Sequence, residues 1–272
     1  MIIRLGYDIG FDVTGEVPIT CVLGVHPSRR GDLLEPDELM VLPSVPVETF
    51  QDLFGNRCYR LVAPAGLLRL SNRTSIRDSG ALDPREPDAR EVPVGELPPE
   101  VLRFLLSSRY CEVDLLAQTA SDLFGNLPHG WSRVEAVCAW VHQHVRFGYE
   151  FADATRTAMG VFTGRLGVCR DFQHLAITLC RALNIPARYV TGYLGDIGVP
   201  IGPDPMDFSA WFEAYLGDRW WTFDARHNRR RIGRVVMGVG LDATDVAITT
   251  SFGEARLIEF NVVTEEVRAS VA

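Results

Sequence analysis

Residues 167–194 read GVCRDFQHLAITLCRALNIPARYVTGYL, and this stretch decides the fold. After Cys169, apolar residues recur three and four positions apart, which predicts an amphipathic helix. Pro186 ends that helix, because proline cannot continue it and disfavours helical backbone in the residue before it. Residues 187–194 then predict a strand. The chain therefore places a cysteine at the start of a helix that leads directly into a strand.

The position of Cys169 favours a reactive thiol. It follows Gly167-Val168 and stands in the first turn of the predicted helix. Free amides and the positive end of the helix dipole both favour thiolate over thiol, and the thiolate is the nucleophile. The ordinary role of an intracellular cysteine is to pack as a small apolar side chain. The turn bounded by glycine and the motifs further along the chain favour the nucleophile instead.

Composition and charge restrict the class of protein. The chain has 272 residues, of which 47% are hydrophobic and 23% are charged, as in an ordinary globular protein of one or two domains. A net charge of −8 argues against nucleic acid or an anionic membrane as the main partner. No stretch is long enough to span a membrane, and the N-terminus lacks a secretory apolar segment. We therefore expect a cytoplasmic protein.

The six cysteines predict neither disulfides nor a metal site. They show no C-x-x-C pair and no spacing typical of a disulfide framework or a zinc knuckle. A cluster of arginines between Arg226 and Arg234 is expected to be a solvated loop.

The chain divides into three parts by pattern. Residues 1–80 contain short apolar runs separated by turn residues, which predicts a small antiparallel β domain. Residues 81–100 are rich in Pro, Asp, Glu and Arg, which predicts a linker or an extended crossover. Residues 101–272 are expected to form the second domain. The clearest predicted strands of the first part are 19–25, 58–63 and 67–75, and the predicted helices of the second are 100–107, 113–124 and 132–146.

A β-hairpin with aromatic arms is predicted after the cysteine helix. Its arms are residues 207–216 and 219–224, joined by Gly217-Asp218 as a two-residue turn. In that register Ser209, Trp211 and Asp224 project from the same side of the sheet. An acidic residue on an otherwise apolar strand needs a partner or a function.

Taken together, these motifs resemble the transglutaminase-like superfamily, and more closely the bacterial transglutaminase-like proteins with an N-terminal β domain. The resemblance rests on GVCRDF, NIPARYVTGY, AWFE and FD, which begin at residues 167, 184, 210 and 223. It implies an α+β fold, in which a small antiparallel β domain precedes a papain-like transglutaminase core. In that core a cysteine at a helix start faces an antiparallel sheet.

The resemblance also implies a chemistry. A Cys–His–Asp triad in this family performs acyl transfer or amide hydrolysis, as a cysteine protease, amidase or acyltransferase. Carried over, Cys169 is the nucleophile, Asp224 orients the base, and Trp211, Arg170 and Asp171 contact the substrate. The implied substrate is a peptide or protein amide, and no metal or organic cofactor is needed.

One position departs from the family pattern. The family usually has histidine immediately before the Ala-Trp pair, whereas this chain has Ser209, which cannot accept a proton from a thiol near neutral pH. His227 is one possible substitute base, although strand parity opposes it. His174 points away from the thiol and is expected to pack in the core.

Two further alternatives remain open. In the first, Cys169 is already ionised by the helix dipole and Arg170 and needs no base. In the second, the chain is an inactive binding module that keeps the fold. The presence together of Cys169, Asp171, Trp211 and Asp224 favours a working thiol enzyme.

Overall fold

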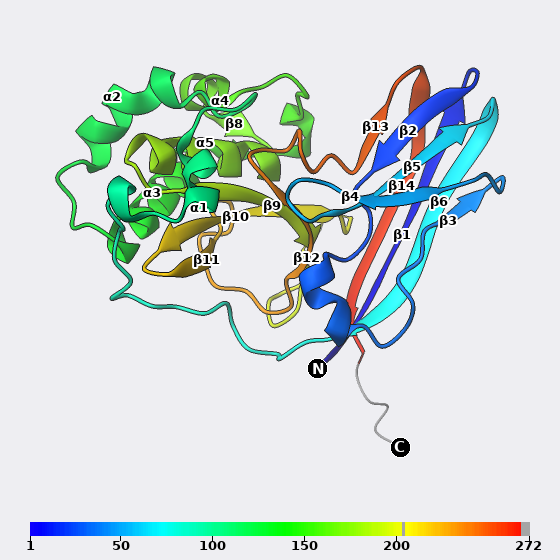
Figure 1. Ribbon diagram of the computed structural model, residues 1–272, viewed down its shortest axis with the longest axis horizontal. Coiled ribbons are helices and arrows are strands. Elements are labelled where there is room, and N and C mark those ends of the chain that lie inside the picture. Colours follow the sequence, from blue (N-terminus) through cyan, green and yellow to red (C-terminus); the bar gives the residue numbers. More distant parts are fainter. Residues whose placement is uncertain (203–204, 268–272) are drawn as a thin grey trace.

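The computed structural model describes residues 1–202 and 205–267. Figure 1 shows two lobes, one made of helices around a sheet and one made of long strands. The strand lobe contains two four-stranded sheets, ordered β14-β1-β6-β3 and β13-β2-β5-β4. Within the described ranges, no helix is long and apolar enough to cross a membrane. The predicted cytoplasmic location stays a prediction.

The strand lobe buries a core between its two sheets. Alternate residues of β1, such as Ile3, Leu5 and Ile9, are completely or almost completely buried there. The predicted strands over 58–63 and 67–75 are confirmed, whereas the strand predicted over 19–25 begins earlier and ends at Cys21. β1 is a further strand that the sequence pattern did not predict. The elements of this lobe are β1 (Ile2–Val13), β2 (Val17–Cys21), η1 (Pro27–Asp32), β3 (Met40–Leu42), β4 (Glu48–Gln51), β5 (Arg57–Ala63), β6 (Gly66–Arg77), β13 (Thr249–Ser251) and β14 (Ala255–Glu266).

The end of the chain returns to this lobe, in contrast to the predicted boundary. Strand β14 pairs with β1 over its whole length, and β13 pairs with β2. Residues 101–272 therefore do not all belong to the transglutaminase core. The physical reason is that β1, paired with β6 on one side, leaves a second edge of backbone donors and acceptors that needs a strand.

The second lobe wraps helices around one sheet of order β11-β10-β9-β12. The predicted helix over residues 113–124 and the hairpin turn are confirmed, the latter by the pairing of Leu216 with Arg219. The first predicted helix is shorter, because it ends in a 3₁₀ turn. The elements are η2 (Val94–Glu96), α1 (Pro99–Leu102), η3 (Arg103–Leu105), α2 (Val113–Phe124), α3 (Trp131–His144), β7 (Arg146–Phe147), η4 (Tyr149–Phe151), α4 (Ala158–Gly164), β8 (Leu166–Gly167), α5 (Cys169–Ala182), β9 (Ala187–Tyr193), β10 (Phe208–Leu216), β11 (Arg219–Phe223) and β12 (Val235–Gly240).

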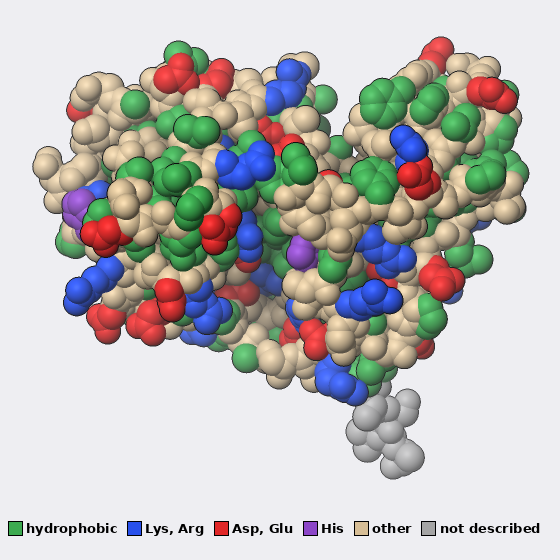
Figure 2. Space-filling view, in the orientation of Figure 1, with side chains coloured by type: hydrophobic (Ala, Val, Ile, Leu, Met, Phe, Trp, Pro, Cys, Tyr) green, Lys and Arg blue, Asp and Glu red, His purple; other side chains and the backbone are tan. Residues whose placement is uncertain are grey.

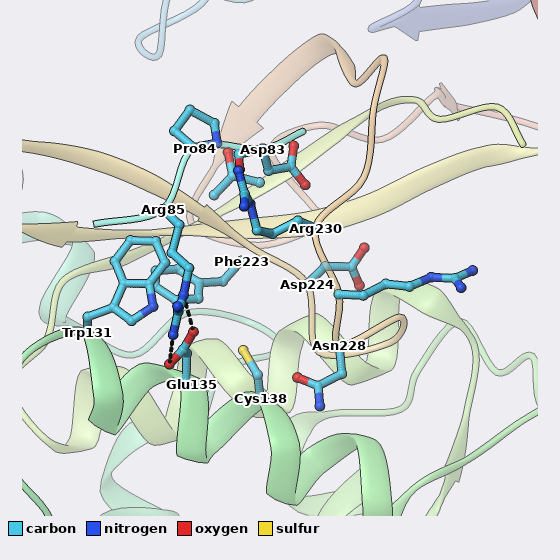
Figure 3. A pocket seen from close by; sticks show the side chains of 12 residues that line it. Asp83, Pro84, Arg85, Trp131, Glu135, Cys138, Phe223, Asp224, Asn228 and Arg230 are labelled. Carbon is cyan, nitrogen blue, oxygen red and sulfur yellow. Dashed lines mark hydrogen bonds and ion pairs between the residues drawn. The ribbon is translucent and has the colours of Figure 1, made fainter. Parts of the chain in front are cut away.

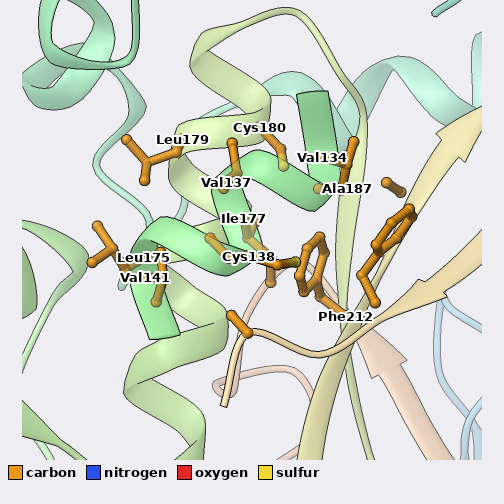
Figure 4. Packing of buried hydrophobic residues seen from close by; sticks show 14 of the residues in the cluster. Val134, Val137, Cys138, Val141, Leu175, Ile177, Leu179, Cys180, Ala187 and Phe212 are labelled. Carbon is orange, nitrogen blue, oxygen red and sulfur yellow. The ribbon is translucent and has the colours of Figure 1, made fainter. Parts of the chain in front are cut away.

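Helix α5 is the centre of this lobe. Leu175, Ile177 and Leu179 are completely buried between the sheet and the surrounding helices (Figure 4). Facing side chains come from α3, such as Val137, and from β10, such as Phe212. Burial of one such side chain contributes about 1.5–3 kcal/mol, so the start of α5 is held in one place.

The predicted linker crosses between the lobes along the lower side of the molecule in Figure 1. It is tied to the second lobe by several contacts. The Asp83 carboxylate accepts from Arg234 Nε at 2.9 Å, and the Ala89 carbonyl accepts from Trp131 N at 3.0 Å. The Glu91 carboxylate lies 3.3 Å from Arg133. Residues 81–100 thus run as a crossover fixed to the second lobe.

Candidate active site

The start of α5 is stabilised by its own acidic residue. Cys169 is the first residue of the helix, and the Asp171 carboxylate accepts a hydrogen bond from Val168 N at 2.9 Å. Gly167 is required beside it, because a Cβ there would lie 2.6 Å from the Asp171 Cβ. Helix starts need such partners for their free amides.

Asp171 is completely buried, in contrast to its predicted contact with a substrate. Its carboxylate lies 3.0 Å from Arg170 and 3.5 Å from Arg156. The Arg170 guanidinium also donates to the Asp153 carbonyl. Arg170 and Asp171 therefore stabilise the loop and helix around Cys169, and Asp171 has no surface on which to bind a ligand.

Cys169 is half-buried, and its thiol is less acidic than its place in the helix predicts. Burial raises the pKa of the Cys169 thiol to about 11, and the nearby Asp207 carboxylate adds to this rise. The Arg226 guanidinium and the backbone amides of Ala210 and Arg170 lower the pKa by less than burial raises it. Loss of hydration destabilises an anion more than one helix start stabilises it here. The thiol is therefore protonated at neutral pH, in contrast to the predicted thiolate.

Asp224 follows the last residue of β11 and collects five hydrogen bonds. Its Oδ1 accepts from the backbone amides of Arg226 and His227 at 3.0 Å each, and from Gln173 Nε2 at 3.2 Å. Its Oδ2 accepts from Arg234 Nη2 at 2.9 Å, and the His227 Nδ1 lies 2.8 Å away. Burial alone would raise the pKa of Asp224, but Arg234 and His227 hold that pKa well below its usual range. Asp224 is thus a buried, ionised carboxylate.

A tight turn brings His227 back onto Asp224. Strand β11 ends at Phe223, and Asn228 N donates to the Asp224 carbonyl at 2.8 Å. Asn228 adopts a φ of 48°, a conformation that asparagine tolerates better than most residues. Strand parity therefore does not apply to His227. Because the ionised carboxylate can only accept, Nδ1 carries the proton and Nε2 of the neutral ring is left as an acceptor.

Ser209 and His227 line the same cleft, together with Arg226 and Asp207. Ser209 is 6% exposed, and its Oγ has no hydrogen-bond partner within the described part of the chain. Ser209 stands where the family usually has a histidine. The turn after β11 thus brings the imidazole of His227 to the same cleft.

Trp211 is 1% exposed, in contrast to its predicted contact with a substrate. Its ring packs under the Arg234 guanidinium, which lies 5.0 Å from the ring centre. Because Arg234 also donates to Asp224, Trp211 helps to position the carboxylate through Arg234. Arg231 and Arg234 are 3% and 8% exposed, so this part of the arginine cluster is buried and paired, not the solvated loop predicted.

Gln173 joins the helix to the turn and was missed by sequence reasoning. It lies four residues after Cys169, and therefore on the same face of α5. Its Nε2 donates to the Ala210 carbonyl and to Asp224 Oδ1, and its Oε1 accepts from Ala225 N, each at 3.2 Å. The spacing of four residues from Cys169 was the signal that could have identified it.

A second thiol near Asp224 is not a competing nucleophile. Cys138 on α3 borders a small cavity on the other side of Asp224, beside the ion pair of Arg85 and Glu135 (Figure 3). It is 3% exposed, and burial raises the pKa of its thiol well above the usual value. Cys138 is therefore an unreactive core residue.

His174 packs in the core, as predicted. It is completely buried, stacks on Tyr110 with ring centres 4.9 Å apart, and its Nε2 accepts from Ala243 N at 3.1 Å. Burial lowers the pKa of His174 to about 3. Among the residues that the structure describes, no group of three or more His, Cys, Asp and Glu side chains could hold a metal ion. The expectation that no cofactor is needed stays a prediction.

Comparison with known proteins assigns the family. The structure of a "putative cysteine protease" from Cytophaga hutchinsonii is 30% identical, with a TM-score of 0.86 over 100% of this chain and 92% of that chain. The chain belongs to the transglutaminase-like superfamily. The model of this superfamily matches residues 117–225, a range that contains Cys169, Ser209 and Asp224 but ends before His227. The predicted superfamily and the α+β fold with an N-terminal β domain are confirmed.

A curated relative covers less of the chain. An uncharacterized protein of Mycobacterium leprae is 37% identical over 84 residues, which are 30% of this chain and 30% of that protein. The match therefore spans under a third of the relative's length.

Proposed function

We propose that this superfamily member is a thiol hydrolase of peptide-like amides, with Cys169 as nucleophile and His227 as the base. The observation that carries the proposal is the 2.8 Å contact between His227 Nδ1 and Asp224 Oδ2. This contact supplies the His–Asp half of the family triad from the turn after β11. The name of the Cytophaga hutchinsonii relative supports peptide hydrolysis over amine transfer.

The state of the thiol makes a base necessary. Because burial raises the pKa of Cys169 to about 11, the thiol must lose its proton during the attack. His227 Nε2 takes this proton while Sγ bonds to the carbonyl carbon of the amide. The ionised Asp224 stabilises the imidazolium that forms. The amine then leaves with the proton, and the acyl group remains on Sγ as a thioester.

Water completes the reaction. The neutral His227 ring takes a proton from water, hydroxide bonds to the thioester carbon, and the acid and the thiol are released. Two backbone amides support the negative oxygen. Cys169 N is in the first turn of α5 and needs no acceptor within the helix, and Ala210 N faces the sulfur.

The surface supports a peptide substrate better than nucleic acid. In Figure 2 the acidic and basic side chains are interspersed on the visible face, without a broad basic region. The net charge of −8 agrees with this distribution.

The test is acylation of Cys169 by p-nitrophenyl acetate. All 27 basic residues other than histidine are arginine, so the chain has no lysine that could be acylated instead. Nitrophenolate release gives the rate, and peptide mass spectrometry identifies the acylated residue. We expect Cys169→Ser to abolish the acylation and His227→Ala to slow it by ~10²–10⁴-fold, the usual contribution of a general base.

Ser209→His separates the competing accounts. If His227 supplies the base, this substitution adds little to the rate. A large gain in Ser209→His with no loss in His227→Ala would instead identify a site that lacks its base. Wild-type release in Cys169→Ser, without acylation at residue 169, would favour the inactive binding module.

A further inference from the structure

One hydrogen bond joins the turn that carries His227 to helix α3. The Arg226 carbonyl lies 2.7 Å from His142 Nδ1, a residue 84 positions earlier in the chain. A carbonyl can only accept, so Nδ1 of His142 carries the proton and donates it. His142 is exposed, so its ring is not required for a core.

This bond acts on the peptide unit that leads into His227. The same unit contains the Arg226 carbonyl and the His227 N–H, and a peptide unit is planar. Its N–H donates to Asp224 Oδ1 at 3.0 Å, while its carbonyl accepts from His142. The plane is therefore held at both ends, once by the turn itself and once from another element.

A second contact holds the same residue. The Arg226 guanidinium lies 3.8 Å from the centre of the Phe147 ring in β7. His142 and Phe147 thus hold the backbone and the side chain of Arg226, respectively. Since the side-chain direction of His227 depends on the preceding peptide plane, rotation of that plane would move the imidazole relative to Asp224 and the cleft.

We propose that His142 is a positioning residue for His227. It holds the Arg226–His227 peptide so that Nδ1 of His227 stays on Asp224 and Nε2 stays available in the cleft. This inference rests on the proposed function, in which His227 is the base.

The chain offers a matched control in His144. This histidine is also exposed on α3, and its Nδ1 also lies 2.7 Å from a backbone carbonyl. That carbonyl belongs to Trp140 in the same helix, on whose ring His144 also stacks. Loss of an exposed histidine from α3 is common to both positions, whereas the contact with the turn is specific to His142.

The experiment measures Cys169 acylation by p-nitrophenyl acetate over a range of ester concentrations. We expect His142→Ala to lower the maximum rate by ~10–10²-fold with an unchanged half-saturation concentration, since a misplacement of about 1 Å costs up to ~10²-fold. His142→Asn should recover most of the rate, because its amide nitrogen lies where Nδ1 lay. His142→Gln places the nitrogen one carbon further and should recover less. His144→Ala should match the wild type.

A double mutant adds a readout that a merely structural effect would not produce. In the His227→Ala background, His142→Ala should lower the acylation rate no further, because there is no imidazole left to position. The inference is overturned if the losses in acylation rate from His142→Ala and His227→Ala are additive. It is also overturned if His142→Ala and His144→Ala have equal rates, or if the Asn variant is no faster than the Gln variant. If His142→Ala does not fold, the Asn and Gln variants carry the comparison. The single variants Cys169→Ser and His227→Ala test the proposed function separately from this inference.

Discussion

The two sides of the candidate site, the start of α5 and the turn after β11, use charge differently. At the start of α5, the Asp171 carboxylate accepts from Val168 N and pairs with two arginines, so it stabilises the loop and the helix. In the turn, the Asp224 carboxylate is held from several directions and in turn holds His227.

This difference underlies the proposed chemistry. The start of α5 supplies a fixed but protonated thiol, because burial raises the pKa of Cys169 to about 11. In the proposed mechanism, the turn supplies the base and the ionised carboxylate that orients it. In that mechanism the thiol on a rigid helix depends on a separate, polar turn for its activation. Gln173 joins the helix to the turn.

The largest effect is expected from Asp224→Asn. Without the negative charge, the imidazolium of His227 loses its stabilisation, and we expect acylation of Cys169 to slow by ~10²–10⁴-fold. Arg234 keeps Asp83 as a partner, so the variant should still fold. Nitrophenolate release measures the rate, and Asp218→Asn in the exposed hairpin turn is the control. A wild-type rate in Asp224→Asn would remove the turn from the mechanism.

An intermediate effect is expected in the pH dependence of Cys169 alkylation. Below its pKa of about 11, a thiol gains tenfold in thiolate fraction for each pH unit. The rate with iodoacetamide should therefore rise roughly hundredfold between about pH 7 and about pH 9, since only the thiolate reacts. Mass spectrometry of the labelled peptides measures the rate, and the urea-unfolded chain gives the free-thiol profile. A plateau already below neutral pH would contradict the difference between the two sides, because it would mean an ionised thiol.

The smallest effect is expected from Gln173→Met, which removes the link between the sides. The substitution keeps the length of the side chain but leaves Ala225 N and the Ala210 carbonyl without their partner. We expect a loss of about 1–3 kcal/mol in the free energy of unfolding, the cost of leaving buried polar groups unpaired. Urea denaturation measures it, with Gln118→Met on the exposed face of α2 as the control. An equal effect in both variants would mean that Gln173 does not join the two sides.

Local patterns in the sequence predicted the elements that carry the site. The spacing of apolar residues after Cys169 predicted α5, and Gly217-Asp218 predicted the turn between β10 and β11. The motifs also identified Ser209 as the departure from the family. These features depend on residues close together in the chain, where helical and strand periodicity and turn chemistry act.

Tertiary structure decided what those residues can do. Contacts between segments far apart in the chain pair β14 with β1 and bring His142 to Arg226. The burial of Asp171 and Trp211 depends on the same kind of packing. The raised pKa of Cys169 depends on how much water the folded chain leaves around the sulfur. The sequence by itself determined which side chains are present and on which elements they lie. Only the folded chain determined their protonation, their accessibility and their partners, because these depend on burial and on contacts between distant segments.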